Sequence, residues 1–153
     1  MIDEPTIVET TEQNCAVIRL TIPREEIRNM MGPAMEEVIT TVALQKIGPA
    51  GPLFSYHLRL DPAVFDFEVG VPVSAPVSPT GRVVEGKLPA ARVVRTIYRG
   101  PYEGLPDAWK DFNGWIGKAG HKPAGDLWER YLVGPDSSQD PSQWQTELSR
   151  RLA

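Results

Sequence analysis

Residues 49–54 read Pro-Ala-Gly-Pro-Leu-Phe, and residues 123–128 repeat them as Pro-Ala-Gly-Asp-Leu-Trp. A motif that recurs together with its surrounding hydrophobic pattern indicates an internal duplication. The sequence therefore predicts two structurally related halves, and this relation decides the fold. The offset that aligns the two copies also aligns three apolar pairs upstream: Met35 with Trp109, Val38 with Phe112 and Val42 with Ile116.

An amphipathic helix is predicted before each copy of the motif. Apolar residues recur at spacings of three and four over residues 35–43 and again over residues 105–119, which is the pattern of a helix with one buried face. Proline suits the start of a helix and glycine its end. We therefore expect these helices to begin and end near the following residues: Pro33 and Gly48 in the first half, Pro106 and Gly120 in the second.

Segments typical of β-strands flank each helix. The alternating or β-branched runs predict strands over 16–22, 53–60 and 64–73 in the first half, and over 92–98, 127–133 and 144–148 in the second. Each half thus follows the order β-α-β-β. The stretch from Pro72 to Gly86 is rich in proline, serine and glycine, which favours a linker.

We therefore predict one α+β domain over residues 1–153, with repeat one at about 7–73, a linker at 74–89 and repeat two at about 90–148. Two β-α-β-β repeats related by a pseudo-twofold axis would form an antiparallel sheet with two helices, because each unit alone leaves a sheet face bare. A central ligand groove is expected where the repeats meet. A chance match of a short motif on an ordinary α+β fold is the alternative.

The composition is that of a globular protein, with 41% apolar and 24% charged residues. The 16 basic and 20 acidic residues give a net charge of −4 without a basic stripe, which argues against direct nucleic-acid binding. No apolar run reaches the ~20 residues that span a bilayer, and the N-terminus has no signal-peptide pattern. With a single cysteine, we expect a cytoplasmic protein.

Several classes of site have no support in the sequence. Two histidines and one cysteine do not form a His/Cys metal site. The GxSxG, GxxxxGK[ST] and GxGxxG motifs are missing, so a serine hydrolase of the nucleophile-elbow type, a P-loop NTPase and a dinucleotide enzyme are not indicated. We expect neither a metal nor a cofactor.

Glu129 is the most informative polar residue. Alternate residues of a strand share a face, so Glu129 and Tyr131 lie together on an otherwise apolar face of 127–133. Burial raises the pKa of a carboxyl group, which would make Glu129 a proton donor or base; ionised, it would be a counter-ion for a cation. The alternatives are an ion pair with Arg95 or Arg130, or an exposed edge position.

Aromatic residues supply the other candidate ligand contacts, because their faces attract cations and flat molecules. Trp109 and Phe112 belong to the helix stripe, and we assign them to the core. In the repeat alignment Ser55 corresponds to Glu129, so a shared groove would bring a nearby histidine towards that carboxylate; a lone strand histidine is also often structural. The candidate ligand-binding residues besides Glu129 are Tyr131, Trp128, Tyr98, Tyr102, Tyr56 and His57.

The order and spacing of several short motifs resemble the GyrI-like family. These motifs are YRGPYE at 98–103, WERY at 128–131, WQTEL at 144–148, GPAM at 32–35 and EVGVPV at 68–73, and the similarity runs from about residue 7 to residue 148. The family includes the effector-binding domains of multidrug-responsive transcription activators. The resemblance implies the two-repeat fold, and it implies that Glu129 contacts cationic, aromatic ligands.

The resemblance leaves three functions open. The leading one is binding or sensing of a hydrophobic, aromatic or cationic small molecule, anchored by Glu129. A second is hydrolysis that opens the cyclopropane rings of cytotoxic natural products, with Glu129 and Tyr131 as catalytic residues. A third is a protein partner, as in members that modulate DNA gyrase. A DNA-binding domain precedes this module in the activators; here the first predicted strand begins near Ile7, so we expect the domain to work alone or with a partner.

Overall fold

The computed structural model describes residues 2–135 and 137–153, apart from the side chain of residue 28. The β-α-β-β order occurs twice, with one further strand before each copy. The elements are β1 (Thr6–Glu9), β2 (Gln13–Pro23), η1 (Arg24–Glu26), α1 (Ile27–Leu44), β3 (Phe54–Leu60), β4 (Val64–Pro72), β5 (Val84–Leu88), β6 (Arg92–Arg99), η2 (Tyr102–Gly104), α2 (Leu105–Lys118), β7 (Pro123–Val133), η3 (Pro141–Gln143) and β8 (Gln145–Leu152).

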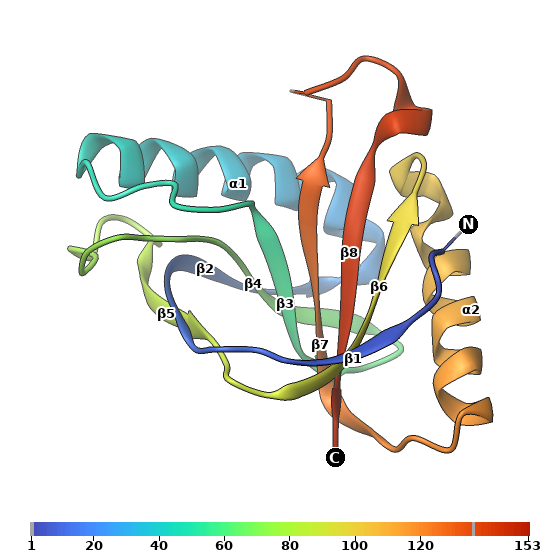
Figure 1. Ribbon diagram of the computed structural model, residues 1–153. Helices are drawn as coiled ribbons and strands as arrows, with labels where there is room; N and C mark the ends of the chain where they lie inside the picture. The colour runs from blue at the N-terminus through green and yellow to red at the C-terminus, as the bar shows by residue number, and fades with distance from the viewer. Residues whose placement is uncertain (1, 136) are drawn as a thin grey trace.

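The eight strands form one antiparallel sheet in the order β1-β6-β8-β7-β3-β4-β2-β5. The counterparts in the two repeats are β1 and β5, β2 and β6, β3 and β7, and β4 and β8. Read from either edge, the sheet shows the same order of counterparts, with β3 and β7 paired at the centre. Twofold-related repeats produce such a palindromic order. The α+β class with two helices on an antiparallel sheet is therefore confirmed (Figure 1).

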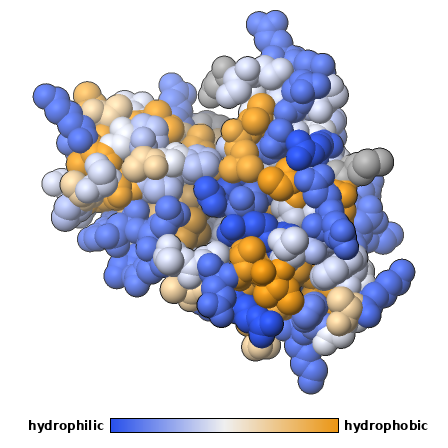
Figure 2. Space-filling view, in the orientation of Figure 1, coloured by the Kyte–Doolittle hydropathy of each residue, from blue (hydrophilic) through white to orange (hydrophobic). Residues whose placement is uncertain are grey.

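Each helix covers the outer strands of its own half. α1 packs on β2 and β4, and α2 packs on β6, through buried side chains such as Val38 and Phe112. A third apolar cluster, including Phe54 and Trp128, lies on the other face of the central strands. Exposed apolar surface is confined to small patches with hydrophilic borders on the side that Figure 2 displays. None of the described helices is long and apolar enough to cross a membrane.

The segment predicted to be a linker contains a strand. β5 pairs with β2 at the edge of the sheet, with Gly86 opposite Cys15. A Cβ atom at Gly86 would come within 2.6 Å of the Val17 side chain, so glycine is needed for this close approach. Gly86, which in the sequence is typical of a linker, therefore allows β5 to pack closely against β2.

The first helix begins earlier than predicted, because Pro33 lies inside it rather than at its start. Proline normally disfavours helical geometry in the residue before it, through a clash with that residue's Cβ atom. Here the preceding residue is Gly32, which has no Cβ atom and lies in open space. The helix therefore continues through a position that reads as an N-terminus in the sequence.

The two helices end in the same way at equivalent positions. Gly120 has a φ of +81°, and the next residue's N–H donates to the Ile116 carbonyl at 3.1 Å. Lys46 has a φ of +60°, and its successor donates to the Val42 carbonyl, also at 3.1 Å. The predicted stop at Gly120 is confirmed. The prediction of Gly48 is wrong, because Lys46 adopts the left-handed conformation usual for glycine at this cap.

Candidate ligand-binding groove

A groove with a volume of about 1200 Å³ lies over the central strands β3 and β7, and both helices contribute to its walls, α1 through Met35 and α2 through Trp109. Both repeats contribute to its walls. The lining side chains that the arguments below use are Arg24, Ser55, His57, Tyr102, Trp109, Glu129 and Tyr131. The groove therefore lies between the repeats.

Glu129 is 9% exposed and faces this groove. Its Oε1 accepts a hydrogen bond from Trp109 Nε1 at 2.6 Å, and its Oε2 accepts one from the Tyr131 hydroxyl at 2.8 Å. No ion pair joins it to a described Arg, Lys or His side chain. Burial raises the pKa of Glu129, and the two hydrogen bonds act in the opposite direction because they favour the carboxylate.

A short hydrogen-bond chain orients Tyr131. The Ser55 hydroxyl lies 2.8 Å from the Tyr131 hydroxyl, and Ser55 and Glu129 are direct cross-strand partners. Since Tyr131 uses its one proton for Glu129, Ser55 supplies the donor for Tyr131. Burial and the nearby Glu129 raise the pKa of Tyr131 well above its ordinary value. The tyrosine therefore stays protonated, and every donor in the chain points towards the carboxylate.

The alternative partners of Glu129 are used elsewhere. Arg95 and Arg130 both lie 3.2 Å from Glu147. Arg130 follows Glu129 in β7 and therefore projects from the opposite face of the sheet. The proposed ion pairs of Glu129 with these arginines do not occur.

Tyr102 joins the groove from the turn before α2. Its ring packs edge-on against Tyr131, with centroids 5.9 Å apart, and lies 4.9 Å from the ring of Trp144. It lines the same groove as Glu129. The structure thus brings together Glu129, Tyr131 and Tyr102, three of the candidate ligand-binding residues.

Three other aromatic candidates lie outside the groove. Trp128 precedes Glu129 and so faces the other side of the sheet, where it is 1% exposed and packs edge-on with Tyr56 at 5.6 Å. The Tyr56 hydroxyl donates to Asp126 at 2.6 Å. Tyr98 is buried beneath α2 and donates to the Pro101 carbonyl at 2.8 Å. Trp128, Tyr56 and Tyr98 therefore pack outside this groove, apart from the other candidate residues.

Trp109 is a groove residue that the sequence analysis assigned to the core. Its indole N–H donates to Glu129, although the ring also packs 5.6 Å from Phe112. Two features of the sequence indicate a position at the groove: the indole N–H of a half-buried tryptophan needs a hydrogen-bond partner, and Trp109 aligns with Met35 in the other repeat. Both of these equivalent residues line the groove.

His57 lines the groove from β3 and lies between two phenylalanines. Its ring stacks on Phe67 with centroids 5.0 Å apart and meets the edge of Phe65 at 5.5 Å. Burial, together with the charge of Arg24, lowers the pKa of His57 to about 4. The imidazole is therefore neutral near pH 7.

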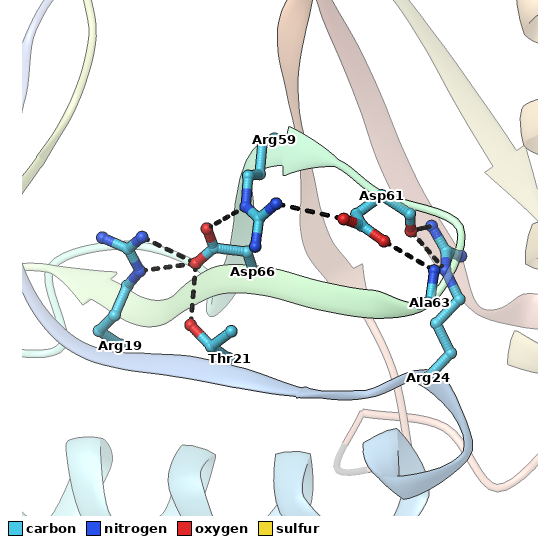
Figure 3. Close-up of polar contacts among 7 residues, drawn as sticks. All are labelled: Arg19, Thr21, Arg24, Arg59, Asp61, Ala63 and Asp66. Carbon is cyan, nitrogen blue, oxygen red and sulfur yellow. Dashed lines mark hydrogen bonds and ion pairs between the residues drawn. The ribbon is translucent and has the colours of Figure 1, made fainter.

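Figure 3 shows how the β3–β4 hairpin is tied to the start of α1. Arg24 donates from Nε and Nη2 to the Asp61 carbonyl, at 2.8 and 2.6 Å. Asp66 lies between Arg19 and Arg59, each with a 2.8 Å contact, and these arginines hold the pKa of Asp66 below its usual value. This network fixes the hairpin that carries His57 into the groove. Among the described residues no group of three or more His, Cys, Asp or Glu side chains could hold a metal ion.

Comparison with solved structures gives the same fold at low sequence identity. The C-terminal domain of EcmrR has a TM-score of 0.80 at 20% identity over 98% of this chain and 97% of that one. An EcmrR–DNA complex matches with a TM-score of 0.79 at 20% identity over 97% of this chain, which spans only 57% of that longer chain.

Two further structures carry other descriptions. SAV2435 bound to tetraphenylphosphonium has a TM-score of 0.73 at 10% identity over 99% of this chain and 94% of that one. A hydrolase from Listeria innocua has a TM-score of 0.63 at 12% identity over 97% of this chain and 91% of that one. A search of curated protein sequences found no match. The sequence profile of the GyrI-like small molecule binding domain matches residues 3–152, and the chain belongs to that family.

Proposed function

We propose that the groove binds hydrophobic, aromatic molecules that carry a positive charge, and that Glu129 is their counter-ion. The observation that carries this proposal is the environment of Glu129: a buried carboxylate that faces the groove, accepts two hydrogen bonds from neutral donors and has no described cationic partner. A buried carboxylate without a counter-charge is costly. A bound cation would offset that cost.

The walls suit such a ligand. Trp109, Tyr102 and Tyr131 surround the carboxylate, and aromatic faces attract cations while they cover apolar surface. Membership of a small-molecule-binding family and the tetraphenylphosphonium complex of the similar SAV2435 support the same ligand class.

The test compares tetraphenylphosphonium with tetraphenylborate, which has similar size and shape and the opposite charge. Calorimetric titration should detect the cation and not the anion. Glu129→Gln should weaken binding of the cation by about tenfold or more, because hydrogen bonds and contacts to charged groups contribute ~1.5–3 kcal/mol. Glu68→Gln is the matched control, since this half-buried glutamate also has a raised pKa but does not line the groove.

Equal binding of the two ions, or equal losses in the two variants, would remove the counter-ion role. Loss of cation binding in Glu68→Gln as well would point to a general effect of the protein's charge. Circular dichroism of each variant separates these outcomes from unfolding.

A second candidate is hydrolytic opening of an electrophilic cyclopropane, favoured by the 2.8 Å contact between the Tyr131 hydroxyl and Glu129 in the groove. Glu129 would take a proton from a water molecule while the oxygen of that water forms a bond to a ring carbon. The electron pair of the cleaved C–C bond would pass to the conjugated carbonyl and form an enol, whose oxygen takes the proton of Tyr131. The proton on Glu129 would then pass to the tyrosinate across their 2.8 Å contact, which restores both groups, and the enol would tautomerise to the ketone. Such acid and base catalysis contributes ~10²–10⁴-fold each. The test is formation of the hydrated product by chromatography, abolished in both Glu129→Gln and Tyr131→Phe.

A further inference from the structure

Side chains of opposite charge line the groove. Glu129 lies on β7, and His57 and Arg24 lie towards the hairpin of the first repeat. His57 pairs with Leu127, so His57 and Glu129 are diagonal neighbours on one face of two adjacent strands, a relation that places residues about 7–8 Å apart. One drug-sized molecule can therefore contact both.

His57 is a polar side chain that faces the groove without a partner. It is 9% exposed, and among the residues that the structure describes it makes ring contacts but no hydrogen bond. Its stacking on Phe67 fixes the ring plane. A neutral imidazole offers one N–H donor and one acceptor, and buried polar groups in proteins nearly always have a partner. A ligand in the groove would provide it.

Arg24 adds a positive charge that no described carboxylate within ion-pair distance balances. Its guanidinium lies 4.3 Å from the centre of the Phe65 ring and donates to a backbone carbonyl, which leaves Nη1 available. Arg59, in contrast, is ion-paired with Asp61 and Asp66. Among the arginines labelled in Figure 3, Arg24 and Arg59 line the groove, and of these two Arg24 is the one without an ion pair to a described carboxylate.

We propose that Arg24 and His57 form a subsite for an anionic oxygen, so that the preferred ligands of the groove are dipolar aromatic molecules with a cation at Glu129 and a carboxylate at Arg24 and His57. The proposal rests on the counter-ion role of Glu129 and extends it to the ligand's other end. Arg24 supplies a charged donor and His57 a neutral one. Hydrogen bonds to a charged acceptor are the stronger kind.

The test uses rhodamine B, which carries a cationic xanthene and a carboxylate, and rhodamine B ethyl ester, which has the same ring system with the carboxylate blocked. Fluorescence anisotropy at pH 7.5 gives the affinity of each dye. The wild-type protein should bind the acid roughly tenfold more tightly than the ester, as expected for one hydrogen bond to a charged group.

Variants assign this preference to residues. Arg24→Gln should lose most of the preference and retain at most the part, about threefold, that His57 supplies, and Arg24→Lys should retain more of it. His57→Phe, which keeps the stacking on Phe67, should reduce the preference by about threefold, as for a neutral donor. Arg19→Gln removes a charge from the same network outside the groove and should leave the preference intact. Thermal melting controls for loss of the Arg24–Asp61 anchor.

Equal affinities of the wild-type protein for the two dyes would overturn the subsite, as would an equal loss of preference in Arg19→Gln and Arg24→Gln. The counter-ion role is tested separately by tetraphenylphosphonium, which has no anionic group. Binding of that cation with dependence on Glu129, but no preference for the acid dye, would reject the subsite alone. Failure of all cations to bind would reject both proposals.

Discussion

Ser55 and Glu129 face each other across β3 and β7, and they are also equivalent residues of the two repeats, since the offset from Pro49 to Pro123 takes Ser55 to Glu129. Their cross-strand pair therefore lies on the axis that relates the repeats. A glutamate at both positions would place two carboxylates side by side, which raises the pKa of one of them. Serine instead contributes a hydroxyl that supports Tyr131, so this cross-strand pair holds one carboxylate.

The Trp109 N–H should control the pH range of cation binding. Because this donor favours the carboxylate form, Trp109→Phe should raise the pKa of Glu129 further. Tetraphenylphosphonium affinity falls as pH decreases through that pKa, so the midpoint of the fall should lie at higher pH in Trp109→Phe. At pH values well above both midpoints the two proteins should agree within about 1 kcal/mol, or fivefold.

Titrations of the cation between pH 5 and 9 measure this midpoint. Ser55→Ala is the control, because Ser55 reaches Glu129 only through Tyr131 and should shift the midpoint less. A midpoint that stays at the wild-type value in Trp109→Phe would contradict the assignment of the titrating group to Glu129.

Glu129 should reduce the stability of the unliganded protein at neutral and higher pH. Its pKa is raised in the folded state, so the stability that protonated Glu129 contributes is present below the ordinary value of 4.5 and is lost as pH rises through the raised value. Glu129→Gln, which stays neutral, should therefore be more stable than the wild type at pH 8. We expect a gain of about 1 kcal/mol, the low end of the cost of burying a polar group.

Urea unfolding at pH 8 and at pH 4.5 measures this difference, which should shrink at the lower pH. Glu37→Gln should show no gain at pH 8, because Arg82 holds the pKa of Glu37 below its usual value. A gain for Glu129→Gln that is independent of pH would mean that the substitution acts through packing.

Much of the fold could be predicted because its elements carry local patterns. The apolar spacing of α2 and the alternation of β4 are visible without tertiary contacts. β5 could not be found in this way, because Gly86 lies at its centre between two charged residues, and its pairing depends on the fit against Val17. The early start of α1 likewise depends on the neighbour of one proline, Pro33.

For the site, strand alternation correctly placed Glu129 with Tyr131, because both lie on β7. The same alternation places Trp128, the residue before Glu129, on the opposite face of the sheet, so it also argues against Trp128 as a groove residue. Trp109 and Arg24 come from α2 and η1, and their approach to the central strands depends on how these segments pack. Contacts between elements of this kind cannot be derived from the spacing within one element.

Trp128 should matter for stability and not for binding. It is 1% exposed in the cluster on the far side of the sheet, so Trp128→Phe should lower the free energy of unfolding by about 1–3 kcal/mol through lost packing. Its side chain does not line the groove, so tetraphenylphosphonium affinity at a temperature where the variant is folded should be unchanged. A large loss of affinity without a loss of stability would place Trp128 at the ligand.

The two helix ends provide a test of the duplication in energetic terms. Lys46 and Gly120 are equivalent and both have positive φ, at +60° and +81°. The left-handed conformation costs a residue with a Cβ atom about 1–2 kcal/mol, while glycine costs roughly 0.5–1 kcal/mol more in chain entropy. Lys46→Gly should therefore stabilise the protein by about 0.5–1 kcal/mol, and Gly120→Ala should destabilise it by about the same amount.

Urea unfolding of both variants measures these changes in the free energy of unfolding. The open space around Gly120 means that a steric clash does not contribute to the change in Gly120→Ala. A Cβ atom at Gly120 would meet nothing within 4 Å, so a loss in Gly120→Ala reflects backbone strain rather than a steric clash. Lys46→Ala separates the backbone effect from the loss of the lysine charge and should show no gain. If Lys46→Gly and Lys46→Ala gained equally, the cap of α1 would not be strained, and the two helix ends would be equivalent in geometry but not in energy.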